Sequence, residues 1–442
     1  MRLLSFACLC LLSVLALAWA LPNLYDMALL PPLDKTHLFY SPVLRQCLYT
    51  ERIRGRDTQA AALSEGHHAD VVYKDEEGHY YDRRAFEAAL PFIYYRNMEM
   101  RGLLPVRLEG RSLDRTAIER ARRVLELPAR ALDGHHPPHT CLPLLEANPG
   151  QVALLYPADR FRMADGEMLF THADTNTREE DLSTLFSDGL RSQGFLFPAR
   201  HVGGNFTTFK PYEGGIFLVD ARGGLFHVLR RDGRPAVRKI PLPQGVTPRH
   251  VLVSESGERH WLGLLLDMRD RLWLIRQTDF TLIGLAVPGY EPDRMDCKLL
   301  FDPLYLTVVT SDAAFARAAV FRIPATDLKN GDVCTPVHTF QHEMSRAKES
   351  WQHRLAQTLF PFRITLAREE TSFLYPRWEL SGHWFSRALP FSLLLTSLHA
   401  LWRRRRHPGW KLTLPRCAVE TSVILLTGVY GLGALLLLEE KI

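Results

Sequence analysis

The sequence lacks the short motifs that usually carry a chemical reaction. It has no nucleophile elbow, phosphate-binding glycine loop, dinucleotide fingerprint, Cys-x-x-Cys pair or haem attachment motif. His342-Glu343 begins like the helix of a zinc protease, but Arg346 stands where the second histidine is needed. We therefore predict no catalytic residue and no cofactor, and we expect that the protein is not an enzyme.

A strong charge imbalance is also missing. The net charge of +5 over 442 residues is small, and five basic residues lie together between Arg403 and Lys411, so the remainder is close to neutral. No basic surface for nucleic acid is predicted. With 46% hydrophobic and 23% charged residues, the chain has the composition of a folded protein and is long enough to bury a large core.

Cysteine is scarce, with seven in the chain. Three fall in or beside apolar segments: Cys8, Cys10 and Cys417. The other four can pair in three ways, and sequence proximity suggests Cys47 with Cys141 and Cys297 with Cys334. Buried unpaired thiols are the alternative.

Three segments are apolar enough to meet a bilayer: Leu3–Ala20, 384–402 and 417–438. The first is about as long as the minimum needed to cross a hydrocarbon core of about 30 Å. It ends in Ala18-Trp19-Ala20, a pattern read by signal peptidase, so it is either an anchor or a cleaved signal peptide. The lipid bilayer is thus a predicted partner.

Basic residues predict the orientation in the membrane. Lys and Arg in short loops mark the cytoplasmic side. Six of them lie between the second and third apolar segments: Arg403, Arg404, Arg405, Arg406, Lys411 and Arg416. We therefore expect that loop to be cytoplasmic, and both the region between the first two segments and the last four residues to lie outside.

The outer region is predicted to be α+β and mainly β. Short apolar runs with turn signals follow one another after residue 151, and comparable strands begin near Ile216, Leu262 and Tyr305, which are 46 and 43 residues apart. This spacing is typical of four-stranded propeller blades. We expect a propeller-like or meander array of antiparallel strands.

The expected fold is a membrane-anchored extracytoplasmic domain with transmembrane helices at both ends. Its predicted parts are an anchor or signal peptide at 1–21, an α+β subdomain at 22–150, a β-rich domain at 151–340, an amphipathic juxtamembrane segment at 341–383, a transmembrane helix at 384–402, a basic cytoplasmic loop at 403–416 and a transmembrane helix at 417–438.

Histidines supply the one candidate metal site. The stretch Asp133–His139 (DGHHPPH) places His135, His136 and His139 within five residues, and neutral imidazoles bind zinc and copper. A solvated polar loop is the alternative.

Several stretches resemble a bacterial family catalogued as domain of unknown function 4857. They are FYSPV (39–43), LPFIYYRNME (90–99), YPADRFR (156–162), GFLFPAR (194–200), GGN (203–205) and KPYEGGIFLVD (210–220). The resemblance implies an envelope protein met near ABC-type transporter subunits, and it supplies no catalytic residues.

The leading hypothesis is a non-enzymatic envelope protein of the bacterial inner membrane, with its large domain in the periplasm. It would be an accessory component of an ABC-type transporter, with permease and ATPase subunits as partners, or of a similar complex. One alternative is a metal-dependent hydrolase or metal-handling protein that uses the histidine loop. Another is a receptor for a glycan or peptide.

Overall fold

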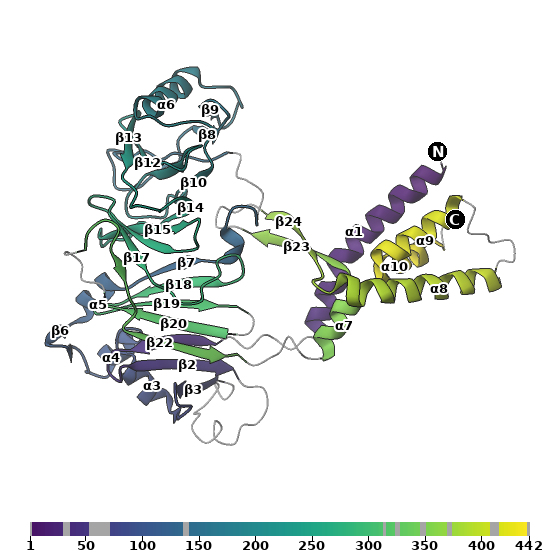
Figure 1. The fold of residues 1–442 in the computed structure, drawn as a ribbon, viewed down its shortest axis with the longest axis horizontal. Helices are drawn as coiled ribbons and strands as arrows, with labels where there is room; N and C mark the ends of the chain where they lie inside the picture. Colours follow the sequence, from purple (N-terminus) through teal and green to yellow (C-terminus); the bar gives the residue numbers. More distant parts are fainter. Residues whose placement is uncertain are drawn as a thin grey trace. The chain divides into compact units, whose positions relative to one another are not determined.

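The computed structural model describes residues 2–29, 36–52, 71–135, 141–312, 315–322, 328–344, 351–368, 374–406 and 415–439. The chain forms two compact units (Figure 1). Unit 1 combines Met1–Leu33 with Ser345–Ile442, and unit 2 is Asp34–Met344.

Unit 2 is mainly β, with four larger sheets. The first has the order β1 (His37–Ser41), β2 (Gln46–Arg52), β3 (Val71–Asp75), β4 (Tyr80–Tyr81). The second has β10 (His201–Gly203), β11 (Ile216–Val219), β12 (Leu225–Arg231), β13 (Arg234–Ile240). The third has β14 (Pro248–Val253), β15 (Trp261–Asp267), β16 (Leu272–Arg276), β17 (Leu282–Leu285), β21 (Val333–Cys334). The fourth has β22 (His338–Glu343), β20 (Phe315–Phe321), β19 (Leu306–Ser311), β18 (Asp296–Phe301), β7 (Arg123–Leu127). Pairing is antiparallel except between β17 and β21.

Smaller elements complete unit 2. The hairpins are β5 (Val106–Leu108) with β6 (Arg111–Leu113), and β8 (Asp159–Met163) with β9 (Met168–His172). The helices are α3 (Arg83–Ala89), α4 (Tyr95–Met100), α5 (Arg115–Ala121), the 3-10 turn η1 (Ala129–Ala131) and α6 (Glu180–Ser192).

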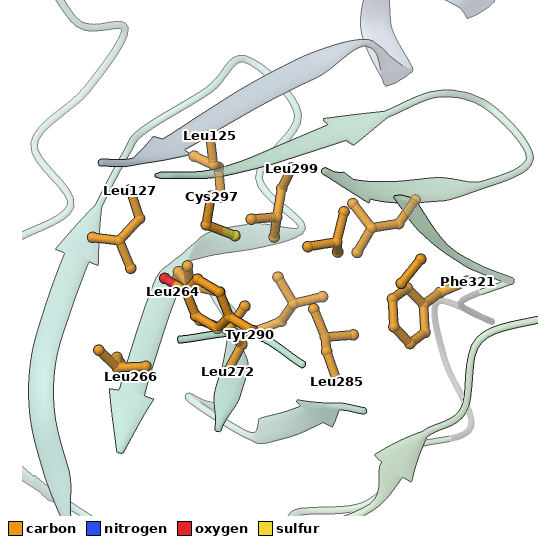
Figure 2. Close-up of a cluster of buried hydrophobic side chains, with 14 of the residues drawn as sticks. Leu125, Leu127, Leu264, Leu266, Leu272, Leu285, Tyr290, Cys297, Leu299 and Phe321 are labelled. Carbon is orange, nitrogen blue, oxygen red and sulfur yellow. The ribbon is translucent and has the colours of Figure 1, made fainter. Parts of the chain in front are cut away.

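The four larger sheets are stacked face to face. Because side chains alternate along a strand, Ile216 and Leu218 of β11 face one side of the second sheet, whereas Phe217 and Val219 face the third sheet. The third sheet buries Leu264 and its neighbours against the fourth (Figure 2). The other face of the fourth sheet packs against the first. Each larger sheet is therefore apolar on both faces.

Helices cover the two ends of the stack. Helix α6 places Phe186 and Leu190 on the outer face of the second sheet, together with the β8–β9 hairpin. Helix α3 places Phe86 on the outer face of the first sheet. Propeller blades would cover one another in a ring, whereas these end sheets are covered by helices.

The predicted strand spacing follows this stack. The positions near Ile216, Leu262 and Tyr305 correspond to β11, β15 and the start of β19, which belong to three successive sheets. Strands β11 and β15 are the second in chain order of their sheets, whereas β19 is the third, because β7 joins its sheet from earlier in the chain. The boundary expected at residue 150 does not separate sheets, because β7 pairs with β18 through Leu125 and Leu299.

The suggested disulfides are wrong. Cys47, Cys141, Cys297 and Cys334 are all free thiols. Cys297 and Cys334 contribute to the same apolar cluster without bonding, and Cys47 is buried whereas Cys141 is exposed. Sequence proximity failed as a guide because sheet register, not chain distance, sets which residues meet.

Unit 1 is mainly helical. It contains α1 (Arg2–Leu29), α7 (Trp351–Leu359), the hairpin β23 (Phe362–Arg368) with β24 (Leu374–Leu380), the π-helical turn η3 (Trp384–Ala388), α8 (Leu389–Arg406), α9 (Pro415–Thr427) and α10 (Val429–Glu439). Within the described ranges, α1 alone is long and apolar enough to cross a membrane. The basic loop expected to begin at 403 begins later, because Arg403–Arg406 form the last turn of α8.

The single helix expected at 417–438 is also corrected. The chain breaks at Gly428, where φ is +59°, a left-handed value that favours glycine. A Cβ on Gly431 would lie 2.6 Å from the Val423 carbonyl oxygen, although residues eight apart in a straight helix are about 12 Å apart along its axis. Helices α9 and α10, with 13 and 11 residues, therefore turn back on each other.

Close stacking of the second and third sheets depends on Gly203 in β10. A Cβ there would lie 2.3 Å from the carbonyl oxygen of Val251 in β14, so the sheets would have to separate. We predict that Gly203→Ala lowers the free energy of unfolding by about 1–3 kcal/mol, measured by urea denaturation of the purified full-length protein. The control is Gly166→Ala, where a Cβ would meet no atom within 4 Å. Equal stability of the two variants would contradict this packing.

Candidate ligand pocket and buried polar network

Unit 2 contains a pocket of about 410 Å³, a size suited to a small ligand. It lies where the first sheet, the segment around α4 and α5, and the β18–β19 hairpin come together. Its apolar lining includes Phe39, Phe92, Ile93, Tyr95, Leu300 and Phe301. The pocket can therefore hold an aromatic or aliphatic group.

Charged side chains line the same pocket. Arg122 stands 5.1 Å from the centre of the Tyr95 ring in a cation–π contact, and the Tyr95 hydroxyl donates to Glu119 at 3.0 Å. Arg122 is exposed at the surface. A ligand with an apolar body and an anionic group would match this combination.

Asp302, also in the lining, follows β18 and begins the turn that leads to β19. Its Oδ1 accepts from the backbone amides of Leu304 and Tyr305, both at 2.7 Å. Burial raises the pKa of Asp302 to about 7. Asp267 occupies the comparable position at the β15–β16 hairpin but also accepts from the side chain of Trp273.

Arg123 connects the pocket to the interior. Its guanidinium donates to the backbone carbonyls of Ser254 and Trp261 at the facing ends of β14 and β15. Burial lowers the pKa of Arg123 to about 10. The Arg123 side chain thus links the pocket lining to the turn that carries Glu255.

Glu255 belongs to a buried charge cluster with Lys210 and Glu213. The Lys210 ammonium lies 2.8 Å from a carboxylate oxygen of each glutamate, and the three side chains are 0–3% exposed. Glu255 also accepts from the side chain of Asn205 at 2.8 Å. Burial raises the pKa of Glu213, and the second carboxylate acts in the same direction. Buried charges of this kind are stable only while each keeps its partners, because the loss of one partner leaves an uncompensated charge.

Gly214 and Gly215 bring the backbone into this cluster. The Gly214 amide donates to Glu255 at 3.0 Å, and the Gly215 amide donates to Glu213 at 2.7 Å. The Gly214 carbonyl accepts from Nε2 of His227 at 2.7 Å. Burial lowers the pKa of His227 to about 4, so the imidazole is neutral.

Of the three histidines predicted as metal ligands, the structure describes His135, so this site stays a prediction. His135 lies 3.1 Å from Asp293 through Nε2, whereas His136 and His139 lie outside the described residues. Two other groups of side chains have ligand atoms within 4.8 Å of one another. They are Asp133 with His201 and His250, and Cys47 with Glu76 and His338.

The residues predicted to set topology lie in unit 1. Arg404, Arg405 and Arg406 are exposed at the end of α8, while Arg403 lies 3.4 Å from Glu420 of α9. Arg416 belongs to α9, and Lys411 is outside the described residues.

The family motifs contain many residues of these sites, although the sequence analysis assigned them no site role. FYSPV supplies Phe39, Tyr40 and Pro42 to the pocket, and LPFIYYRNME supplies Leu90, Phe92, Ile93 and Tyr95. KPYEGG supplies Lys210, Glu213 and both glycines of the charge cluster. Their partners Asp302 and Glu255 carried no local signal, because they come from distant strands.

The model of a protein family, Domain of unknown function (DUF4857), matches residues 37–321. The chain belongs to this family. The DUF4857 match lies entirely within unit 2 and includes every residue of the pocket and of the charge cluster.

A search of curated proteins found no match to the sequence. Among solved structures, the β-propeller domain of Cps50 (Swd1) from Myceliophteria thermophila is similar over 53% of this chain and 61% of that one, with 9% identity. This chain thus spans less than two thirds of that structure. The TM-score of 0.24 is too low to equate the two folds.

Asp302 should make the stability of unit 2 depend on pH. Its pKa of about 7 exceeds the ordinary value of 3.8, so the unfolded chain loses the proton first and stability falls as pH rises through this window. We predict that Asp302→Asn removes this fall and is on the order of 2 kcal/mol more stable than the wild type near pH 8, with little gain near pH 4.

Urea unfolding followed by tryptophan fluorescence measures this effect. Asn keeps the oxygen that accepts from Leu304 and Tyr305, so the turn is retained. Asp174→Asn, at an exposed position, is the control. If Asp302→Asn leaves the pH dependence of stability unchanged, the pKa of the Asp302 carboxyl is not raised in the folded protein.

Proposed function

We propose that this DUF4857 protein is a non-enzymatic, membrane-anchored accessory component of a membrane complex. The complex that we favour is an ABC-type transporter of the bacterial inner membrane, with unit 2 of this protein on the periplasmic side. The observation that carries the proposal is the apolar outer surface of unit 1. Leu11 and Leu12 of α1 are 60% and 62% exposed, and Leu437 of α10 is 61% exposed. Such a surface suits lipid or a neighbouring membrane subunit.

Small residues support close packing of the helices within this unit. Ala18 of α1 and Ala434 of α10 are fully buried in one cluster, and a Cβ on Gly433 would lie 3.1 Å from Leu17. Close approach at small residues is the usual basis of helix association in membranes.

Helix α1 also supports an uncleaved anchor. Val14 and Ala18 share a core with Tyr430 and Ala434. Beyond Ala20, the Tyr25 hydroxyl donates to the Gln352 carbonyl at 2.7 Å. Cleavage after Ala20 would remove part of this core, so we infer that α1 stays attached.

The broken C-terminal segment changes the proposed topology. Membrane crossing needs about 20 helical residues, whereas α9 and α10 have 13 and 11. Near its end, α10 packs with Phe6 and Cys10, close to the start of α1 (Figure 1). We infer that α9 and α10 enter and leave on one side, the cytoplasmic side marked by Arg403–Arg406. Helix α8 is not long and apolar enough to cross by itself, so we infer that η3 and α8 together provide the second crossing.

Reporter fusions test this topology. A phosphatase that is active only outside the cytoplasm should be active when inserted at Gly166, an open turn of unit 2. Fusions after Leu412 and after Ile442 should both be inactive. If the fusion after Ile442 is active and the one after Leu412 is not, the C-terminal segment crosses the membrane and does not form a hairpin on one side. An inactive fusion at Gly166 with an active one after Leu412 would overturn the orientation.

Co-purification tests the accessory role. We predict that tagged full-length protein, extracted from its native membrane in mild detergent, brings permease and ATPase subunits in near-stoichiometric yield. An unrelated tagged membrane protein of similar abundance serves as the control. Recovery of the protein without these subunits would contradict the role.

The pocket favours a second candidate, a receptor for a small amphipathic ligand. In that case the same preparation should contain a bound molecule detectable by mass spectrometry. Phe92→Ala, which opens the apolar wall, should lose it, whereas Phe209→Ala, at a side chain that is 95% exposed, should keep it.

A further inference from the structure

We propose that Cys47, Glu76 and His338 form a metal site for a divalent cation of the zinc type. The three residues come from β2, the turn after β3, and β22, so the site lies where the first and fourth sheets of unit 2 meet. It is separate from the predicted histidine loop and from the proposed accessory function.

The three ligand groups already converge. Their ligand atoms lie within 4.8 Å of one another. Oε1 of Glu76 accepts from the Cys47 amide at 2.5 Å and is hydrogen-bonded to Nε2 of His338. Zinc requires about 2.0–2.3 Å to nitrogen, oxygen and sulfur, so modest side-chain rotations would let one ion replace the hydrogen bonds.

The donor set selects the kind of ion. A thiolate and an imidazole favour zinc and related transition metals over magnesium or calcium, and one carboxylate completes a three-ligand site with a fourth position for water. His338 would coordinate through Nε2, with its proton on Nδ1.

Binding would release the Cys47 thiol proton to solvent. Without a metal, burial and the neighbouring Glu76 carboxylate raise the pKa of the Cys47 thiol, so sulfur keeps its proton. A bound cation reverses this balance, because a coordinating thiol loses its proton.

Solvent can reach the site from one side. Cys47 is fully buried, whereas the side chains of Glu76 and His338 are 20% and 28% exposed. An ion would enter past the carboxylate and imidazole and meet the sulfur last. Once bound, it would link β22 to the first sheet.

The group of Asp133, His201 and His250 is less suited to a metal. Nε2 of His201 accepts from the Val251 amide at 3.0 Å, and Nδ1 lies 2.5 Å from Asp133. While Nε2 accepts the hydrogen bond from the Val251 amide, the ring proton must lie on Nδ1. Coordination of a metal through Nδ1 would then require an imidazole that has lost both ring protons. The hydrogen bond between His201 and Asp133 accounts for the closeness of these side chains without a metal.

Cobalt titration tests the proposal, because a cobalt–thiolate bond gives a charge-transfer band in the near ultraviolet. We predict that full-length protein, stripped of metal with chelator and kept in detergent, binds about one equivalent of Co²⁺ with this band. Cys47→Ser should lose the band. His338→Gln and Glu76→Gln, which retain the buried thiol, should each weaken binding by at least about 10-fold.

Cys141→Ser removes an exposed thiol and should leave the band and the affinity unchanged. Circular dichroism of each variant confirms that it is folded. A band that survives Cys47→Ser, an unchanged affinity in both His338→Gln and Glu76→Gln, or no Co²⁺ binding by the wild type would overturn the site. Binding without a thiolate band that is lost in His201→Gln would assign the metal to the other group.

Discussion

The burial of both faces of each larger sheet is the constraint on which unit 2 depends. All seven residues of β15 are buried, including Leu264 on one face and Leu265 on the other. Antiparallel sheets commonly keep one face in water, but the third sheet cannot, because both faces of β15 are apolar. Each sheet therefore needs a neighbour on either side, and the stack ends where α6 and α3 supply a cover with a polar outer surface. Helix α3 at one end, and α6 with the β8–β9 hairpin at the other, therefore end the stack.

The same constraint explains where the polar chemistry lies. Between apolar sheet faces, buried amides and carbonyls need partners, and side chains from the strand ends supply them. Asp302 and Asp267 both cap hairpins, and Asp302 also lines the pocket, where burial raises its pKa. Arg123 and the Lys210 cluster fill a comparable need beside β14. The pocket and the charge cluster are thus consequences of stacking as well as candidates for function.

Unit 1 follows a different physical rule. Its helices expose leucine side chains and bury small residues, and they approach closely at glycines. The ion pair between Arg403 and Glu420 is also largely buried. In water this would be an unfavourable surface, whereas in lipid the driving force between helices is close packing. Gly428 then matters more than hydropathy, because the same apolar composition fits one long helix or two short ones. This break turns the C-terminal apolar segment back on itself.

The sequence by itself determined the properties that depend on near neighbours. These are the β-rich texture, the spacing from Ile216 to Tyr305, the apolar α1, the basic run at Arg403 and the motifs of the family. Only the tertiary structure decided the pairing of Lys210 with Glu255, the meeting of Phe92 with Asp302 in one pocket, the free state of the thiols and the turn at Gly428. Local patterns fix what a segment can form, because periodicity and turn chemistry act over a few residues. Sheet order and register fix what distant segments meet, and neither is written in any single stretch of the chain.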